Sequence, residues 1–189
     1  MTTATNVNEL SGTYVLDPTH TRVGFVTRHA MVTKVRGAFN EFTGSAYFDG
    51  ENPANSSGEV TIQVASIDTR NADRDKHLRG LDFLGIDEYP EITFRTTAIT
   101  PTGPDAFDVT GDLTIKGITR SVTIPFTFEG QATDPFGNVR VGFEGSATIN
   151  RKDFGITWNA ALETGGVLVA DKVVLEFEVS AIKQDAAAN

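Results

Sequence analysis

The chain has 189 residues, a net charge of −9, 39% hydrophobic residues and no cysteine. Its length suits one domain with one core, and the absence of cysteine excludes disulfides, thiolate metal sites and cysteine nucleophiles. The negative charge works against nucleic acids and anionic membrane surfaces, because both need clustered positive charge.

The two ends of the chain carry no periodic pattern. Residues 1–10 are polar and 184–189 read QDAAAN, so we expect flexible tails around a single domain at 11–183. The N-terminus lacks the basic and apolar regions of a secretion signal, and no apolar run is long enough to span a bilayer. We therefore expect a cytoplasmic protein without stable membrane insertion.

In the first half of the chain, apolar and polar residues alternate imperfectly over 22–28, 37–50, 58–67 and 91–99. This alternation is typical of strands that have one buried face. Segments rich in Gly, Pro and Asn follow at 51–58 and 100–106, and this composition indicates loops.

The segment 70–80, RNADRDKHLRG, breaks the strand pattern. Asn71 or Asp73 can cap a helix, and Asp75 stands four residues before Arg79, a favourable order for a helical ion pair. We expect a short helix near 72–84 that covers one end of a barrel. Its inward side chains would be Leu78, Leu81 and Phe83.

The same cluster of charge has a functional interpretation. Arg74, His77 and Arg79, with Lys76, could attract an anionic lipid headgroup at a cavity entrance. Charged clusters on helices are more often solvated faces, and the neighbouring aspartates offset half of the local positive charge. Both interpretations stay open at this stage.

The second half alternates more strictly. Residues 107–117 and 121–130 flank a hairpin turn at Gly117, and further strands follow at 139–149 and 172–180. Consecutive antiparallel strands with one apolar face close as a sandwich or a barrel. Runs of about ten residues favour the barrel. We predict an all-β fold: an extended, antiparallel, lipocalin-like barrel of about eight strands, whose interior is filled by side chains or holds one small ligand.

The residues that would line this interior share the apolar parity of their strands. Gly111 and Gly145 interrupt two of these faces, and we favour a role in strand curvature over one in opening space. The candidate lining residues are Val23, Phe25, Val60, Ile62, Val64, Phe94, Phe107, Val109, Leu113, Val122, Ile124, Phe126, Val141, Phe143, Leu175 and Phe177.

The evidence for catalysis is weak. His20 and His29 are nine residues apart, so on one strand they would face opposite sides and share no metal. Common hydrolase, zinc and nucleotide motifs are absent. One alternative function is an enzyme acting on a prenyl or other lipid substrate through His77 with Asp73 or Asp75. Another is an interaction or stress-response module whose barrel is filled by its own side chains. We expect no metal and no cofactor.

The segment SIDTRNADRDKHLRGLDFLGIDEYPEITF at 66–94 resembles the signature of the YceI-like family of bacterial lipid-binding and polyisoprenoid-binding proteins. The blocks YVLDPTHTRVGF, GDLTIKGITRSV and GFEGSATINRKDFGI also resemble this family, over about 12–183. The resemblance implies a barrel that holds an isoprenoid, such as a quinone or polyprenyl compound, for sequestration, storage or transport. It also suggests a homodimer, while several relatives are periplasmic.

Overall fold

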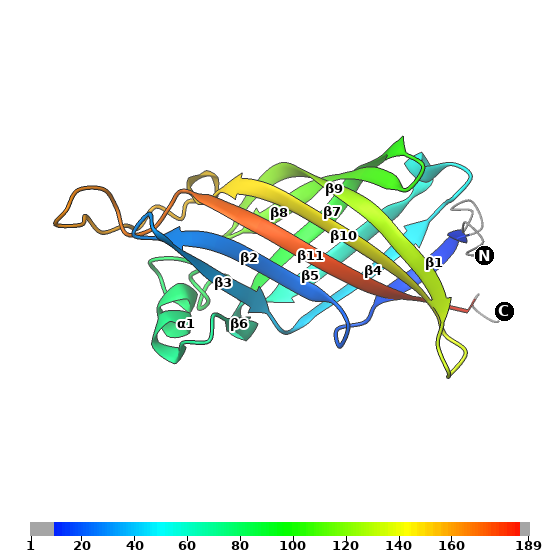
Figure 1. Ribbon diagram of the computed structural model, residues 1–189, viewed down its shortest axis with the longest axis horizontal. Helices are drawn as coiled ribbons and strands as arrows, with labels where there is room; N and C mark the ends of the chain where they lie inside the picture. Colours follow the sequence, from blue (N-terminus) through cyan, green and yellow to red (C-terminus); the bar gives the residue numbers. More distant parts are fainter. Residues whose placement is uncertain (1–9, 186–189) are drawn as a thin grey trace.

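Antiparallel strands make up most of the computed structural model, which describes residues 10–185 (Figure 1). The single α-helix of the described residues, α1 (Ala72–Arg79), lies at the end of the barrel opposite the chain termini. Short 3-10 turns occur at Pro53–Asn55, Val64–Ser66 and Arg151–Phe154. The strands are β1 (Gly12–Leu16), β2 (Arg22–His29), β3 (Thr33–Phe39), β4 (Phe42–Phe48), β5 (Ser57–Gln63), β6 (Ile67–Asp68), β7 (Glu91–Gly103), β8 (Ala106–Ile115), β9 (Ile118–Thr133), β10 (Val139–Asn150) and β11 (Lys172–Lys183).

The sheet closes on itself. Its order is β1-β4-β5-β7-β8-β9-β10-β11, and β1 pairs with β11 to complete an antiparallel barrel of eight strands. Closure removes the unpaired strand edges of an open sheet. The predicted lipocalin-like barrel is confirmed.

At two places in the barrel wall, two successive strands stand where one continuous strand would be expected. β1 and β2 both pair with β11, through Leu16↔Ala181 and Arg22↔Glu178, so they follow each other along one edge. β4 and β3 follow each other in the same way, and the single strand predicted at 37–50 is therefore wrong. It divides because β4 pairs with β5, whereas β3 pairs with β2 and β6.

This division opens the sheet near α1. Among the described strands β6 pairs only with β3, whereas β7 pairs with β5 and β8. The end that contains α1 is called the helix side below, and the end near the termini is called the terminal side (Figure 1). On the helix side, α1 and two irregular segments, 80–90 and 151–171, complete the structure in place of a continuous sheet.

The helix is shorter than predicted. Asn71 is the N-cap, since its side-chain oxygen accepts from the backbone N–H of Arg74 at 2.9 Å. The helix ends at Arg79, because the next residues fold back, with the N–H of Gly85 donating to the carbonyl of Gly80 at 2.8 Å. Leu81 consequently points outward and is 75% exposed, against our expectation, while Phe83 is buried as expected.

At the terminal side, Leu10 is buried, although we placed it in the N-terminal tail. Its carbonyl accepts a 2.7 Å hydrogen bond from the Tyr14 hydroxyl, which ties this residue to β1. The rest of that predicted tail, and the end of the C-terminal one from residue 186, lie outside the described residues. The hairpin at Gly117 is confirmed, with Ile115 and Ile118 paired across it.

Candidate functional site

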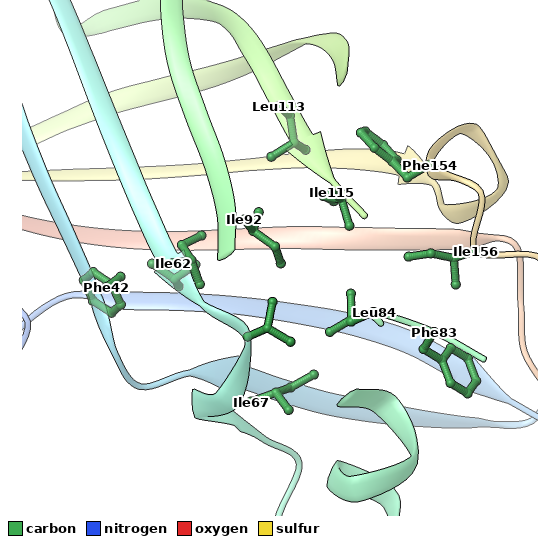
Figure 2. Packing of buried hydrophobic residues seen from close by; sticks show 12 residues of the cluster. Phe42, Ile62, Ile67, Phe83, Leu84, Ile92, Leu113, Ile115, Phe154 and Ile156 are labelled. Atoms are coloured by element: carbon green, nitrogen blue, oxygen red, sulfur yellow. The ribbon is translucent and has the colours of Figure 1, made fainter. Parts of the chain in front are cut away.

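The apolar interior of the barrel contains two packed clusters. The helix-side cluster has buried side chains from several strands and from the two irregular segments, and Figure 2 shows these side chains pointing toward one another from different walls. The terminal-side cluster is smaller and consists of Leu10, Tyr14, Phe107, Phe128, Val141 and Ala181. The helix-side cluster consists of Val23, Phe42, Ile62, Val64, Ile67, Phe83, Leu84, Ile92, Leu113, Ile115, Phe154 and Ile156.

The predicted lining residues divide into a buried group and a half-buried group. All of them lie on the same face of their strand as a member of one of the two clusters, or within the cluster itself. The buried ones are Val23, Ile62, Val64, Phe107, Leu113, Ile124 and Val141. The half-buried ones are Phe25, Val60, Phe94, Val109, Val122, Phe126, Phe143, Leu175 and Phe177.

The half-buried group is the unusual feature, because large apolar side chains inside a filled barrel lose nearly all their accessible surface. Phe126 of β9 and Phe177 of β11 illustrate it: their ring centroids are 6.1 Å apart across β10, and both rings keep accessible surface. These half-buried apolar side chains form a band along the interior face of the strands, and most of them pack against one of the two clusters while keeping some accessible surface.

Interior glycines let the rings of this band lie against the barrel wall. A Cβ atom at Gly145 would stand 2.6 Å from the Phe126 ring, and one at Gly37 would stand 2.3 Å from the Phe25 ring. Gly111 has the same relation to Phe94, at 2.4 Å. Each ring therefore occupies the space of a missing side chain on a neighbouring strand. Gly111 and Gly145 therefore make room for aromatic rings, whereas the sequence alone favours a role for them in strand curvature.

On the helix side, Asp75 and Arg74 are engaged with Thr69. The buried Asp75 carboxylate accepts from the Thr69 backbone N–H at 2.8 Å and from its hydroxyl at 2.5 Å. The Arg74 guanidinium donates to the Thr69 hydroxyl at 2.8 Å and to its carbonyl at 2.7 Å. The ion pair predicted between Asp75 and Arg79 is therefore wrong, because Asp75 fastens α1 to the segment after β6.

His77 lies beside a groove on the outer side of α1. Its Nε2 is 2.9 Å from Asp82 Oδ2, and its ring packs edge-on against Trp158 and Phe83, with centroids 4.8 Å and 5.0 Å away. The proposed pairing with Asp73 or Asp75 is thus replaced by one with Asp82. The groove measures about 370 Å³ and is lined by Asp73, Lys76, His77, Gly80, Leu81 and Asp82.

Sequence reasoning missed Arg151, which organises the segment leading to β11. This arginine is only 4% exposed and donates to the carbonyls of Ile156 at 2.8 Å, and of Trp158 and Ala170 at 2.9 Å. Burial lowers the pKa of its guanidinium, partly countered by Asp171. The bonds position Trp158, the only tryptophan of the chain, against His77 and the helix-side cluster.

A second polar network joins strands at the terminal side. Asp17 Oδ2 accepts from Arg140 at 2.5 Å, and Arg140 also donates to Asp134 at 2.9 Å. Hydrogen bonds from Thr19, and then from Arg140 and His20, hold the pKa of Asp17 well below its usual range. Hydrogen bonds, first from the Asn138 side chain, lower the pKa of Asp134 to about 2. This network holds the chain segment between β1 and β2 against the β9–β10 hairpin.

Neither polar region is arranged for metal chemistry. Within residues 10–185, no group of three or more His, Asp or Glu side chains is placed to hold a metal ion. The same part of the chain contains no helix long and apolar enough to cross a membrane.

Comparisons with known proteins identify the family. A model of the YceI-like domain matches residues 14–181. A UPF0312 protein of Pseudomonas aeruginosa is 46% identical over 137 residues, covering 72% of this chain and 71% of the relative. A UPF0312 protein of Azotobacter vinelandii is 40% identical over 149 residues, covering 78% of each chain.

Solved structures agree with this assignment. BcnA of Burkholderia cenocepacia has a TM-score of 0.77 at 31% identity, covering 87% of this chain and 98% of BcnA. The Campylobacter jejuni YCEI protein has a TM-score of 0.72 at 28% identity, covering 84% and 90%. A polyisoprenoid binding domain from Saccharophagus degradans shares the fold, with a TM-score of 0.69 at 15% identity over 90% and 98% of the two chains. The chain belongs to the YceI-like family.

Proposed function

We propose that this protein binds a long-chain isoprenoid lipid, of the quinone or polyprenyl type, in the apolar interior of its barrel. The proposed role is sequestration, storage or transport, without chemistry on the lipid. The observation that carries the proposal is the band of half-buried apolar side chains between and beside the two packed clusters. A ligand tail lying along this band would cover the surface that the chain leaves accessible.

The dimensions and energetics fit such a ligand. The sixteen residues of β9 span roughly 50 Å along the strand, so the interior suits a long, narrow chain. Each buried CH₂ group contributes roughly 0.8 kcal/mol, and a tail of several prenyl units needs no polar partner in the interior. A solved relative of the same fold is described as a polyisoprenoid binding domain, which supports the choice of ligand class.

The remaining expectations stay predictions. His77 lines the helix-side groove and Arg79 precedes the lining residue Gly80 in the chain, so these two are the candidates for headgroup contact, whereas Arg74 already bonds Thr69. A homodimer, a stress-response role and a cytoplasmic location are likewise proposals. If the protein instead acted chemically on its lipid through His77, His77→Ala should abolish turnover of a prenyl substrate while leaving lipid binding intact.

The first test is native mass spectrometry of the gently purified protein, followed by organic extraction of any bound lipid. We expect a stoichiometric isoprenoid that dissociates on unfolding. A protein that is empty and also fails to take up added polyprenyl lipid from detergent would refute the proposal.

A matched pair of variants locates the site. Phe126→Asp places a carboxylate in the interior band and should weaken isoprenoid binding roughly tenfold or more. Phe136→Asp makes the same exchange at a side chain that is 89% exposed, and binding should not change. Trp158 fluorescence can follow the titration, because it is the only tryptophan. Equal affinity of the two folded variants would place the ligand elsewhere.

A further inference from the structure

The hairpin that joins β2 and β3 ends in exposed apolar side chains. Met31 is 57% exposed and Val32 is 75% exposed. The turn is closed by the backbone N–H of Val32, which donates to the carbonyl of His29 at 3.1 Å. Figure 1 shows this hairpin at the helix side of the barrel, beside the segment that precedes β11.

The turn has an uncommon backbone for its residue types. Ala30 and Met31 have φ angles of 51° and 62°, the left-handed conformation that glycine and asparagine adopt most easily. A β-carbon in this region carries a steric cost. A turn that keeps Met31 at such a position retains an apolar side chain at its tip, and strained positions of this kind cluster at functional sites.

A second segment extends the apolar tip. The backbone N–H of Ala30 donates to the carbonyl of Leu168 at 2.7 Å, which places the 157–170 segment next to the hairpin. Val167 of that segment is 40% exposed. The tip therefore presents apolar side chains from two adjoining segments. Within 157–170 the acidic residue is Glu163, and Asp171, which follows directly, is paired with Lys152.

The hairpin is positively charged in a negatively charged protein. Residues 26–39 contain Arg28, Lys34 and Arg36 and no acidic residue, although the chain carries −9 overall. All three cations are exposed. Arg36 lies 3.9 Å from Glu176, whereas no carboxylate of the described residues forms an ion pair with Arg28 or Lys34. Salt screens charges beyond about 8 Å at physiological ionic strength, so the local charge decides a close contact.

We propose that the β2–β3 hairpin is a peripheral contact with anionic lipid bilayers. Met31 and Val32 enter the interface between headgroups and acyl chains, and Arg28 and Lys34 pair with lipid phosphates. The proposal rests on the proposed function, since a carrier of a water-insoluble isoprenoid exchanges it with a membrane. The hairpin would bring to the bilayer the helix side, where α1 and irregular segments cover the barrel.

A bilayer fits this surface better than a protein partner does. The tip is a narrow projection and not a groove, whereas stable protein interfaces bury roughly 800 Å² on each partner. An apolar tip flanked by cations is the arrangement found in segments that bind the membrane interface. The exposed Phe136 lies in the opposite, terminal-side hairpin beside the acidic Asp134, and the cation of that hairpin, Arg140, is paired with Asp134 and Asp17.

The test is flotation of the full-length protein with vesicles of phosphatidylcholine, with and without phosphatidylglycerol, at low ionic strength. We expect binding that requires phosphatidylglycerol and decreases with added salt. Val32→Asp should weaken it roughly tenfold or more, and Arg28→Gln and Lys34→Gln roughly fivefold each. The control Phe136→Asp should bind like the unmodified protein. Thermal melts and light scattering check that each variant keeps its fold and its oligomeric state.

Three results would overturn the proposal: equal vesicle binding by Val32→Asp and the unmodified protein, equal loss in Phe136→Asp, or a change of oligomeric state in the hairpin variants alone. Isoprenoid loading from detergent separates this proposal from the proposed function. Val32→Asp should load from detergent like the unmodified protein but more slowly from anionic vesicles. Vesicle binding by a protein that never takes up isoprenoid would support the hairpin contact and refute the lipid-carrier function.

Discussion

Replacing Gly37 by alanine should force the Phe25 ring away from the barrel wall. The new Cβ would stand 2.3 Å, 2.8 Å and 2.9 Å from three atoms of that ring, and no backbone atom is among its nearest neighbours. The closest overlap is therefore with the ring, which has to move away from the Gly37 position to relieve it. Overpacking of this kind costs about 1–3 kcal/mol.

A double-mutant cycle tests whether the ring causes this cost. Phe25→Ala alone should destabilise the protein by about 2–4 kcal/mol, because it removes a half-buried ring. In that background Gly37→Ala should cost nothing, or stabilise by up to about 1 kcal/mol, since alanine suits a strand better than glycine does. The coupling between the two sites should thus be at least about 1–3 kcal/mol.

Urea unfolding of the four proteins measures the cycle. The control is Gly142→Ala, where a new Cβ would meet its nearest neighbour at an ordinary 3.8 Å and should change stability by less than about 1 kcal/mol. Isoprenoid affinity measured alongside should fall in Gly37→Ala, because the displaced ring occupies ligand space. An equal cost of Gly37→Ala with and without the Phe25 ring would refute the reasoning.

The remaining predictions concern polar groups. Arg151→Met should destabilise the protein by about 3 kcal/mol or more in urea unfolding, because it leaves buried carbonyls without donors; a loss below about 1 kcal/mol would contradict this account. The folded-state pKa of Asp134 lies below its ordinary value, so its contribution is present above about pH 4 and is lost as the pH falls toward 2. Asp134→Asn should flatten the pH dependence of stability in that window, and an unchanged acid profile would argue against the network. The Thr27 hydroxyl is buried without a hydrogen-bond partner in the described structure, so Thr27→Val should be neutral or stabilise by about 1–2 kcal/mol, and a clear loss in thermal melts would reveal a hidden partner.

Local sequence pattern was sufficient for much of the architecture. The alternation of Phe107, Val109 and Leu113 along β8, and the turn at Gly117, follow from residues close together in the chain. The helix cap at Asn71 is a local signal of the same kind. The predicted lining residues likewise lie on the strand faces that carry the two clusters.

Side-chain contacts that depend on how the chain folds back on itself could not be predicted from the pattern. It could not show that Asp75 bonds Thr69 instead of Arg79, or that Arg151 bonds the carbonyl of Ala170, nineteen residues further along the chain. The division of 37–50 into β3 and β4 depends on which strands pair with each half.

The sequence by itself therefore determined the strand period, the antiparallel hairpins and the apolar face, because side-chain alternation is a property of one strand and its neighbours in the chain. Only the tertiary structure decided which glycine faces which ring, where the sheet opens beside α1, and which end of the barrel carries the cationic hairpin. These features depend on the register between strands, and one apolar pattern is compatible with more than one register until every strand has its partner.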